Sequence, residues 1–505
     1  MDEISFFEYH SERRLSEQTL EDMGILSLQK TFLNQQQLES VTHYLCRIPP
    51  HDEIKRRQEF FESCFHDRMA QEYLKTAESY FRHLHRIKTF YLDKTDTSLY
   101  HIRYAVAYCR MIEGLTSINI AFTDSILTHV FAIAKSEQRK TCYCELKNQL
   151  RNLFQILEKY RRTALWIQTS KSEHKAAAVM PEVQKATYAK RLLDGLETVF
   201  HIEMKEKREK LSLSEADKYL SFLGERFSEV KSALQCCTQF CSSYPFLQTE
   251  NGISDGCIID SLRILYDFLK RKSIPLCLPR LSENARLHIL NGFDISLLKT
   301  KDTIVPNDFY AETYLSLVHG TNSGGKTDFL RMIGICPIFA LVGFYVPANE
   351  MTIPYIGCVY TAFAQDEAIH AGRLTNEQKR MEKILSETRA YDLVLVNEIY
   401  SSTNQKESAE LSNEILKKFH ENCCYVVWNS HQDYDLHEKT FSILLYTPEI
   451  TSTNEKTFKI VRSDRCDTKS QLIAASYGLT YNDLIKKWRQ KGWIAANDAQ
   501  VGDDK

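Results

Sequence analysis

The spacing of apolar residues divides the chain into two parts. In the first part, apolar residues recur every three or four positions, as in TLEDMGILSLQKTF (19–32) and DEIKRRQEFFESCF (52–65). This spacing predicts amphipathic helices. From about residue 103 to 244 it continues with few Gly or Pro breaks, and we expect extended, rod-like helices there. The sequence therefore predicts a mostly α-helical region over residues 1–285.

The pattern changes to short apolar runs after SIPLCLPRL (273–281). Five runs are typical of buried strands: TYLSLVHG (313–320), YIGCVYTAF (355–363), YDLVLVNE (391–398), CCYVVWNS (423–430) and SILLYTPE (442–449). Because helical patterns lie between several of these runs, we expect an α/β domain with a largely parallel sheet over 286–505. A helix-rich segment at 469–493 closes this domain. The longest apolar run, 333–348, is too short to span a bilayer and is predicted to be a buried helix.

Composition narrows the class of protein. The chain has 505 residues, of which 43% are apolar and 26% charged, and its net charge is −2. These values indicate a globular protein of several domains and exclude a uniformly basic nucleic-acid binder. Residues 135–210 nevertheless hold 17 Lys plus Arg against 10 Asp plus Glu, a surplus of 7. This surplus fits either a solvated helix surface or a stripe that meets nucleic-acid phosphates.

The cysteines and the N-terminus favour a cytoplasmic protein. The N-terminus, MDEISFFEYH, is acidic and lacks a long apolar core, so it is not expected to be a signal peptide. Fifteen cysteines are scattered without zinc-site spacing. We expect free thiols. The densest group, Cys236, Cys237 and Cys241, is interpreted as packed thiols rather than a metal or redox site.

A phosphate-binding motif lies between a predicted strand and a predicted helix. GTNSGGKT matches G-x-x-x-x-G-K-[ST], whose backbone N–H groups hold phosphate oxygens. We expect Lys326 to reach the β- and γ-phosphates of ATP and the Thr327 hydroxyl to bind Mg²⁺. The predicted nucleotide-binding residues of the loop are Gly320, Thr321, Asn322, Ser323, Gly324, Gly325, Lys326 and Thr327.

Polar residues end two of the later predicted strands. Glu398 ends the predicted strand at 391–398, where a carboxylate close to the γ-phosphate can orient or deprotonate an attacking water. Asn397 stands where an aspartate beside Mg²⁺ is usual; it keeps a carbonyl oxygen for a metal-bound water but lacks the charge. Such a loss is expected to weaken metal binding about 10–100-fold. His431 follows the next strand and is a candidate γ-phosphate sensor. Glu398, His431 and Lys326 are therefore the predicted catalytic residues.

These motifs together resemble the MutS mismatch-repair ATPases. The loop at 320–327, NEI at 397–399 and SH at 430–431 share the order and approximate spacing of that family. VPND at 305–308 resembles the segment beside the adenine, which implies nucleotide contacts for Pro306 and Asn307. AFAQDEAIHAGRLT at 362–375 resembles the segment ending in the loop that reaches the partner's nucleotide. KSQLIAASYGLTYNDLIKK at 469–487 resembles the dimerising helices.

The resemblance implies a helical core and lever followed by an ABC-like P-loop ATPase. It further implies a homodimer formed through the ATPase domain, ATP and Mg²⁺ as ligands, and a slow ATPase that acts as a nucleotide-gated DNA clamp in mismatch repair or recombination. No membrane partner is expected. Because few residues precede the segment that resembles the helical core, we expect a short form that lacks the mismatch-reading and connector domains. Phe6, in FFE at 6–8, satisfies the Phe-x-Glu wedge pattern, but without a carrier domain we do not expect it to stack on a base.

Two departures from the family keep another function open. Leu374 stands where a serine usually contacts the partner's ATP, with Thr375 as the alternative contact. YSS at 400–402 replaces a Gly-Arg-Gly run. With Asn397, these departures suggest an alternative: a nucleotide-gated scaffold with little hydrolysis and no direct DNA contact. An ATPase of the SMC or transporter kind ranks last, because residues 370–384 contain no L-S-G-G-Q signature.

Overall fold

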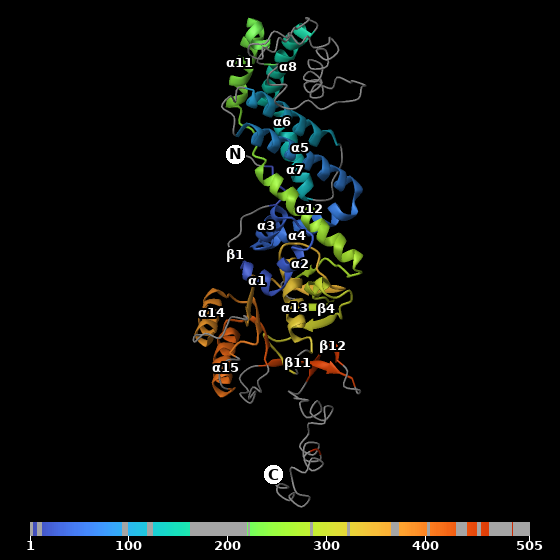
Figure 1. Cartoon of the computed structure of the whole chain (residues 1–505), viewed down its shortest axis with the longest axis vertical. Coiled ribbons are helices and arrows are strands. Elements are labelled where there is room, and N and C mark those ends of the chain that lie inside the picture. Colours follow the sequence, from blue (N-terminus) through green and yellow to red (C-terminus); the bar gives the residue numbers. More distant parts are fainter. Residues whose placement is uncertain are drawn as a thin grey trace, which may run out of the picture. The chain divides into compact units, whose positions relative to one another are not determined.

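A computed structural model gives the fold of this protein. It describes residues 4–7, 13–92, 99–118, 125–161, 220, 223–282, 286–320, 324–364, 373–400, 405–430, 442–451, 456–463 and 487. The chain forms two compact units (Figure 1). We call residues 1–8 and 59–259 the helical unit, and residues 9–58 and 260–505 the sheet unit.

Helices that pack on one another make up the helical unit. Its elements are α5 (Arg68–Leu92), α6 (Tyr100–Ser117), α7 (Ser125–Arg139), α8 (Thr141–Arg161) and α11 (Ser228–Ser243), with parts of α4 (His51–His66) and α12 (Glu250–Arg271). The expectation of extended rods is wrong for the described part of 103–244, because α6, α7 and α8 end after 15 to 21 residues and pack together. Much of the basic segment 135–210 lies outside the described residues.

The N-terminal phenylalanines are part of the core of the helical unit. Phe6 is 3% exposed, and its ring centroid lies 5.9 Å from that of Phe60 and 6.0 Å from that of Phe81. The backbone N–H groups of Phe6 and Phe7 both donate to the buried carboxylate of Asp255. A side chain enclosed in this way cannot stack on a base. Phe6 is therefore a core residue, in keeping with the expectation against a wedge.

A six-stranded sheet forms the centre of the sheet unit. Its strands lie in the order β12, β11, β6, β10, β9, β8; β11 and β12 are antiparallel and the other neighbours are parallel. The strands are β6 (Leu315–Val318), β8 (Val359–Phe363), β9 (Leu393–Asn397), β10 (Tyr425–Asn429), β11 (Ile443–Ile450) and β12 (Lys456–Ser463). The five strand predictions and the largely parallel sheet are confirmed. Helices α14 (Arg373–Glu387) and α15 (Gln405–Glu421) also belong to this unit.

A second sheet of four strands was not predicted. Its order is β3 (Arg280–Leu281), β7 (Glu350–Ile353), β4 (His288–Gly292), β5 (Asn307–Tyr310), and a short 3-10 helix, η2 (Ile295–Lys299), follows β4. Strand β3 has only two residues, and the pairing of β4 with β5 shifts register between Ile289 and Gly292. Strands this short or irregular give no period-2 signal in the sequence.

Residues 13–58 contain six short elements and group with the sheet unit. They are β1 (Arg13–Arg14), α1 (Glu17–Asp22), α2 (Ile25–Gln29), α3 (Gln35–Leu45), β2 (Arg47–Ile48) and the start of α4. The helical prediction for 19–32 is confirmed for 19–22 and 25–29, and the break includes Gly24, where φ is +71° and a Cβ atom would lie 2.5 Å from that of Ser296. Only glycine fits there, and it separates α1 from α2. The predicted domain boundary after residue 285 stays a prediction.

The predicted buried helix at 333–348 is confirmed as far as residue 341. It is the second half of α13 (Lys326–Leu341), whose residues from Met332 onward are all buried although Pro337 lies inside the helix. No described helix is both long and apolar enough to cross a membrane. The fourteen cysteines in the described part of the chain are free, and Cys237 and Cys241 are buried with their sulfurs 3.9 Å apart.

Truncating Phe6 should destabilise the helical unit. Phe6→Ala removes a ring that fills space between Phe60 and Phe81, so we expect the free energy of unfolding to fall by about 3 kcal/mol. Denaturant unfolding followed by circular dichroism measures this loss. Leu92→Ala is the control, because Leu92 is 70% exposed and its truncation should change stability by less than about 0.5 kcal/mol. Equal stability of Phe6→Ala and the parent protein would contradict the assignment of Phe6 to the core.

Candidate functional site

The candidate site lies at the carboxyl ends of three adjacent parallel strands. Asn429 ends β10 and is paired in register with Asn397 at the end of β9 and with Val318 at the end of β6. After β6 the chain continues into the glycine-rich loop, and the backbone N–H of Ser430 donates to the carbonyl of Val318. Residues from the three predicted motifs thus meet at one edge of the sheet.

The glycine-rich loop has the backbone conformation that its sequence requires. Gly320 has φ +136°, and a Cβ atom there would lie 2.6 Å from Pro448 Cδ. Gly325 has φ +90° and caps the N-terminus of α13, where the Phe329 N–H donates to its carbonyl at 2.9 Å. The buried Gly324 is also described, whereas Thr321, Asn322 and Ser323 lie outside the described residues. The N–H groups at the start of α13 can bind an anion.

Lys326 is a buried cation at this helix terminus. It is 4% exposed, and its Nζ donates to the carbonyl oxygen of Gly320 at 2.6 Å. Burial lowers the pKa of Lys326 to about 8, and the opposing effect of the nearby Glu398 charge is smaller. A phosphate anion would favour the charged ammonium and offset this cost of burial. The residues present therefore suit a polyphosphate ligand.

Three polar side chains converge beside Lys326. The amide oxygen of Asn397 accepts from Nδ2 of Asn429 at 2.7 Å and from Oγ1 of Thr327 at 3.4 Å. Asn429 is fully buried. Its hydrogen bond holds the Asn397 oxygen on the side of Thr327, so the hydroxyl and the amide oxygen form a pair of hard oxygen donors of the kind that Mg²⁺ prefers.

The chain leaves β9 through two residues in left-handed conformations. Glu398 has φ +55° and Tyr400 has φ +60°. The Glu398 N–H donates to the Asn429 carbonyl at 3.1 Å, and the Tyr400 N–H donates to the carboxylate of Glu377 in α14 at 2.8 Å. Non-glycine residues in this region cost about 1–3 kcal/mol each. The turn after β9 is thus held by hydrogen bonds rather than by glycine.

Sequence reasoning missed Asn429. The signal that identified Asn397, a polar residue at the end of a buried apolar strand, is also present at Asn429. After this strand, however, His431 was the predicted site residue. His431 lies outside the described residues. Leu374, at the start of α14, is half-buried against the core of the sheet unit, whereas Thr375 is exposed. Leu374 is therefore a packing residue here.

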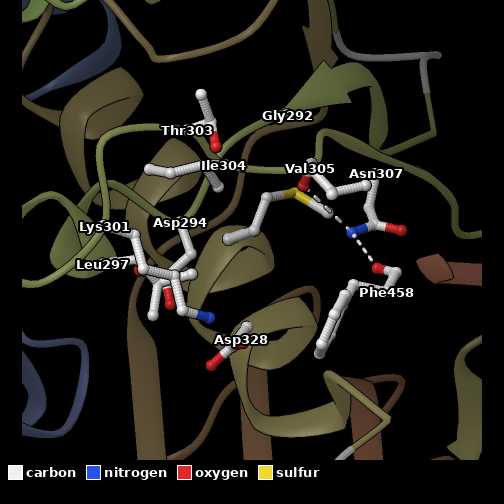
Figure 2. A pocket seen from close by; sticks show the side chains of 11 residues that line it. Gly292, Asp294, Leu297, Lys301, Thr303, Ile304, Val305, Asn307, Asp328 and Phe458 are labelled. Carbon is white, nitrogen blue, oxygen red and sulfur yellow. Dashed lines mark hydrogen bonds between the residues drawn. The ribbon is translucent and has the colours of Figure 1, made fainter. Parts of the chain in front are cut away.

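A cavity of about 270 Å³ lies next to the first turns of α13 (Figure 2). It is lined by Asp328 and Met332 of α13, by Phe458 of β12 and by residues of the segment that precedes β5. Lys301 Nζ lies 5.4 Å from the centre of the Phe458 ring. The lining residues are Gly292, Asp294, Leu297, Lys301, Thr303, Ile304, Val305, Asn307, Asp328, Met332 and Phe458.

Asn307 lines the cavity and also ties β5 to β12. Its Nδ2 donates to the Phe458 carbonyl at 3.2 Å, and its Oδ1 accepts from the Ile460 N–H at 2.7 Å. Pro306 is not among the lining residues. Burial raises the pKa of Asp294 to about 7, although the hydrogen bond from Ser296 lowers it. The cavity is thus lined by both apolar and charged side chains, and burial holds the pKa of one of its carboxyl groups well above the usual range.

Comparison with known proteins connects this site to one family model. Residues 316–486 match the model of MutS domain V. A DNA mismatch repair protein MutS from Thermus thermophilus is 29% identical over 155 residues, 30% of this chain and 19% of that protein. One from Alkaliphilus metalliredigens is 23% identical over 242 residues, 45% of this chain and 28% of that protein.

An Endonuclease MutS2 from Clostridium perfringens is 23% identical over 225 residues, 40% of this chain and 29% of that protein. This chain therefore spans less than a third of the length of these three relatives. The match to MutS domain V covers α13 and the strands β9 and β10, each of which ends in asparagine.

The low pKa of Lys326 predicts that ATP affinity depends on pH. Below about pH 8 the ammonium is charged and attracts phosphate; above it the free protein must first take up a proton. We expect ATP affinity to fall with rising pH above 8, by up to about tenfold per unit. Calorimetric titrations between pH 7 and 9.5 would measure this. Lys326→Arg should flatten the profile, because the guanidinium stays charged; the same pH profile for both proteins would contradict the role of Lys326.

Proposed function

We propose that this protein binds ATP with Mg²⁺ at the carboxyl edge of its larger sheet and hydrolyses ATP slowly. The observation that carries the proposal is the buried Lys326 ammonium at the start of α13, next to Thr327, Asn397 and Glu398. The match of residues 316–486 to MutS domain V supports it. The base would enter the cavity beside α13, where Asn307 and Val305 contribute to the wall.

Each residue has a distinct role in this proposal. Lys326 neutralises charge on the β- and γ-phosphates, and the Thr327 hydroxyl holds Mg²⁺. Asn397 accepts a hydrogen bond from a metal-bound water. Glu398 orients or deprotonates the attacking water, and His431 contacts the γ-phosphate. When bound, Mg²⁺ would neutralise phosphate charge; the remaining catalysis is positioning and electrostatic stabilisation by the protein.

We further propose that two copies associate through their ATPase domains and act as a nucleotide-gated clamp on DNA. The relatives named DNA mismatch repair protein MutS support this extension, as does the basic surplus in residues 135–210. The segment at 469–487, proposed to contain the dimerising helices, lies outside the described residues apart from residue 487.

A specific observation favours a second candidate, the nucleotide-gated scaffold. The Asn397 oxygen carries no charge and already accepts two hydrogen bonds, and Leu374 is used in packing. Both features reduce the contacts to Mg²⁺ and to a partner's nucleotide. In this alternative the protein binds ATP, turns it over very little and makes no direct contact with DNA.

Two substitutions separate binding from hydrolysis. Lys326→Ala should abolish ATP binding, because it removes the ammonium that neutralises phosphate charge. Glu398→Gln should keep ATP bound and lower turnover by about 100-fold or more, because it removes the group that activates water. Equilibrium binding and phosphate release measure the two properties. Lys299→Ala and Glu449→Gln replace exposed residues of the same unit and serve as controls. Unaltered turnover in both test variants would overturn the proposed hydrolytic site.

The salt dependence of DNA binding separates the clamp from the scaffold. A clamp that neutralises about six phosphates should lose about 10³-fold in affinity between 50 and 200 mM salt. Filter binding with duplex, mismatched and branched DNA measures this slope. Absence of binding to all three at low salt would favour the scaffold.

A further inference from the structure

Asp22, the last residue of α1, joins three elements of the sheet unit. Its side chain is 7% exposed. Oδ2 accepts from the Thr361 hydroxyl of β8 at 2.6 Å and from Nη2 of Arg380 in α14 at 2.9 Å. Its backbone carbonyl accepts from Nε of Arg331 in α13 at 3.0 Å. Asp22 therefore contacts α13, β8 and α14.

Arg380 extends this junction to the carboxyl end of β8. Its guanidinium donates to the carbonyls of Thr361 and Phe363, both at 3.1 Å. Phe363 is the register partner of Asn397, and the Ala364 N–H donates to the Asn397 carbonyl at 3.1 Å. Hydrogen bonds thus lead from the Asp22 carboxylate, through Arg380 and the end of β8, to the backbone of Asn397.

The carboxyl end of β8 depends on hydrogen bonds from elements outside the sheet. Within the described residues β8 is the last strand of the sheet, so only β9 pairs with it. An edge strand presents backbone groups that no further strand takes up, and strand ends open locally at low cost in free energy. Arg380 satisfies two carbonyls at this end, and Asp22 fixes the guanidinium by a charge-assisted hydrogen bond.

We propose that Asp22 is a positioning residue for the metal-binding edge of the ATP site. Its backbone carbonyl accepts from Arg331 and so attaches it to α13, which begins with Lys326 and Thr327. Through Arg380 it fixes the strand end against which Asn397 is paired. It thereby sets the separation of 3.4 Å between the Thr327 hydroxyl and the Asn397 oxygen. This inference rests on the proposed ATP-binding and hydrolytic function.

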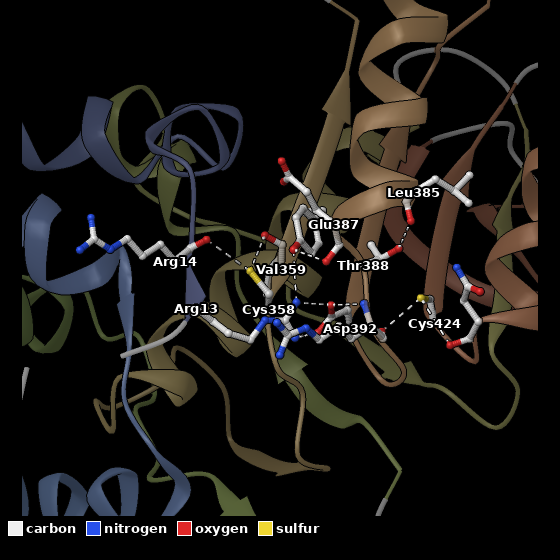
Figure 3. A network of polar contacts seen from close by, with 12 residues as sticks. Arg13, Arg14, Cys358, Val359, Leu385, Glu387, Thr388, Asp392 and Cys424 are labelled. Atoms are coloured by element: carbon white, nitrogen blue, oxygen red, sulfur yellow. Dashed lines mark hydrogen bonds and ion pairs between the residues drawn. The ribbon is translucent and has the colours of Figure 1, made fainter. Parts of the chain in front are cut away.

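The same N-terminal segment offers a matched control at the amino ends of β8 and β9, and Figure 3 shows the polar contacts there. Arg13 pairs with both carboxylate oxygens of Asp392, at 2.7 and 2.6 Å, and donates to the Tyr360 hydroxyl. Asp392 precedes β9, so this pair stabilises the amino ends of the strands, away from Asn397. Arg13→Lys and Arg380→Lys therefore make one chemical change at two ends of the same strands, each losing the planar fork while keeping the charge.

The experiment compares the Mg²⁺ concentration that half-saturates ATP turnover in the parent protein and in Asp22→Asn, Arg380→Lys and Arg13→Lys. ATP affinity without metal and the melting temperature are measured alongside. We expect Asp22→Asn and Arg380→Lys to raise the Mg²⁺ requirement about tenfold, as for outer-shell partners of metal ligands, with little change in metal-free ATP affinity. Arg13→Lys should lower the melting temperature and leave the Mg²⁺ requirement unchanged.

Each outcome decides the inference. An unchanged Mg²⁺ requirement in Asp22→Asn, or an equal rise in Arg13→Lys, would overturn the positioning role and leave the proposed function intact. If Asp22→Asn does not fold, Arg380→Lys gives the answer by the same criterion. A parent protein that neither binds nor hydrolyses ATP would overturn the proposed function, and the inference with it.

Discussion

The parallel register of β6, β10 and β9 is the constraint on which the candidate site depends. Because these strands run in one direction and are paired residue by residue, their carboxyl ends lie at one level and bring Asn429 beside Asn397. A slip of one residue would turn the Asn429 side chain to the other face of the sheet. The Asn397 oxygen would then lose its 2.7 Å hydrogen bond and its orientation toward Thr327. The apolar runs that determine the strand register therefore also determine the positions of the polar side chains in the candidate site.

Helix α13, which follows the glycine-rich loop after β6, supplies the positive charge of the candidate site. Almost every residue of α13 is buried, so the helix cannot tilt without opening the core. This rigidity keeps the Lys326 ammonium in a poorly solvated place, where burial lowers its pKa. A buried cation is costly unless it is paired. At Lys326, a polyphosphate ligand would offset this cost because its charge replaces the lost solvation.

Elements with a local periodic pattern could be predicted from the sequence, whereas features that depend on contacts between distant residues could not. Five of the six strands of the large sheet, the glycine-rich loop and the buried helix each have a signal within about 16 residues, whereas β12 was not predicted. The attachment of residues 13–58 to the sheet unit depends on pairs such as Arg13 with Asp392 and Asp22 with Arg380, which are separated by 379 and 358 residues. No periodic pattern contains such pairs. Asn429 was missed for another reason. Its amide is neutral, and the sequence motifs used to predict the site consist mainly of charged or glycine-rich positions.

Residues 398–400 after β9 contain no glycine, and packing holds Tyr400 in a conformation that glycine would adopt without strain. Tyr400 adopts φ +60° where glycine would be unstrained, but its ring is fully buried and its N–H donates to Glu377 of α14. Burial of one aromatic side chain contributes about 2–3 kcal/mol, which is of the same order as the strain. The same helix holds the end of β8 through Arg380. Helix α14 therefore supports both backbone segments that flank Asn397, which makes the geometry of this site a property of the surrounding elements rather than of its own sequence motif.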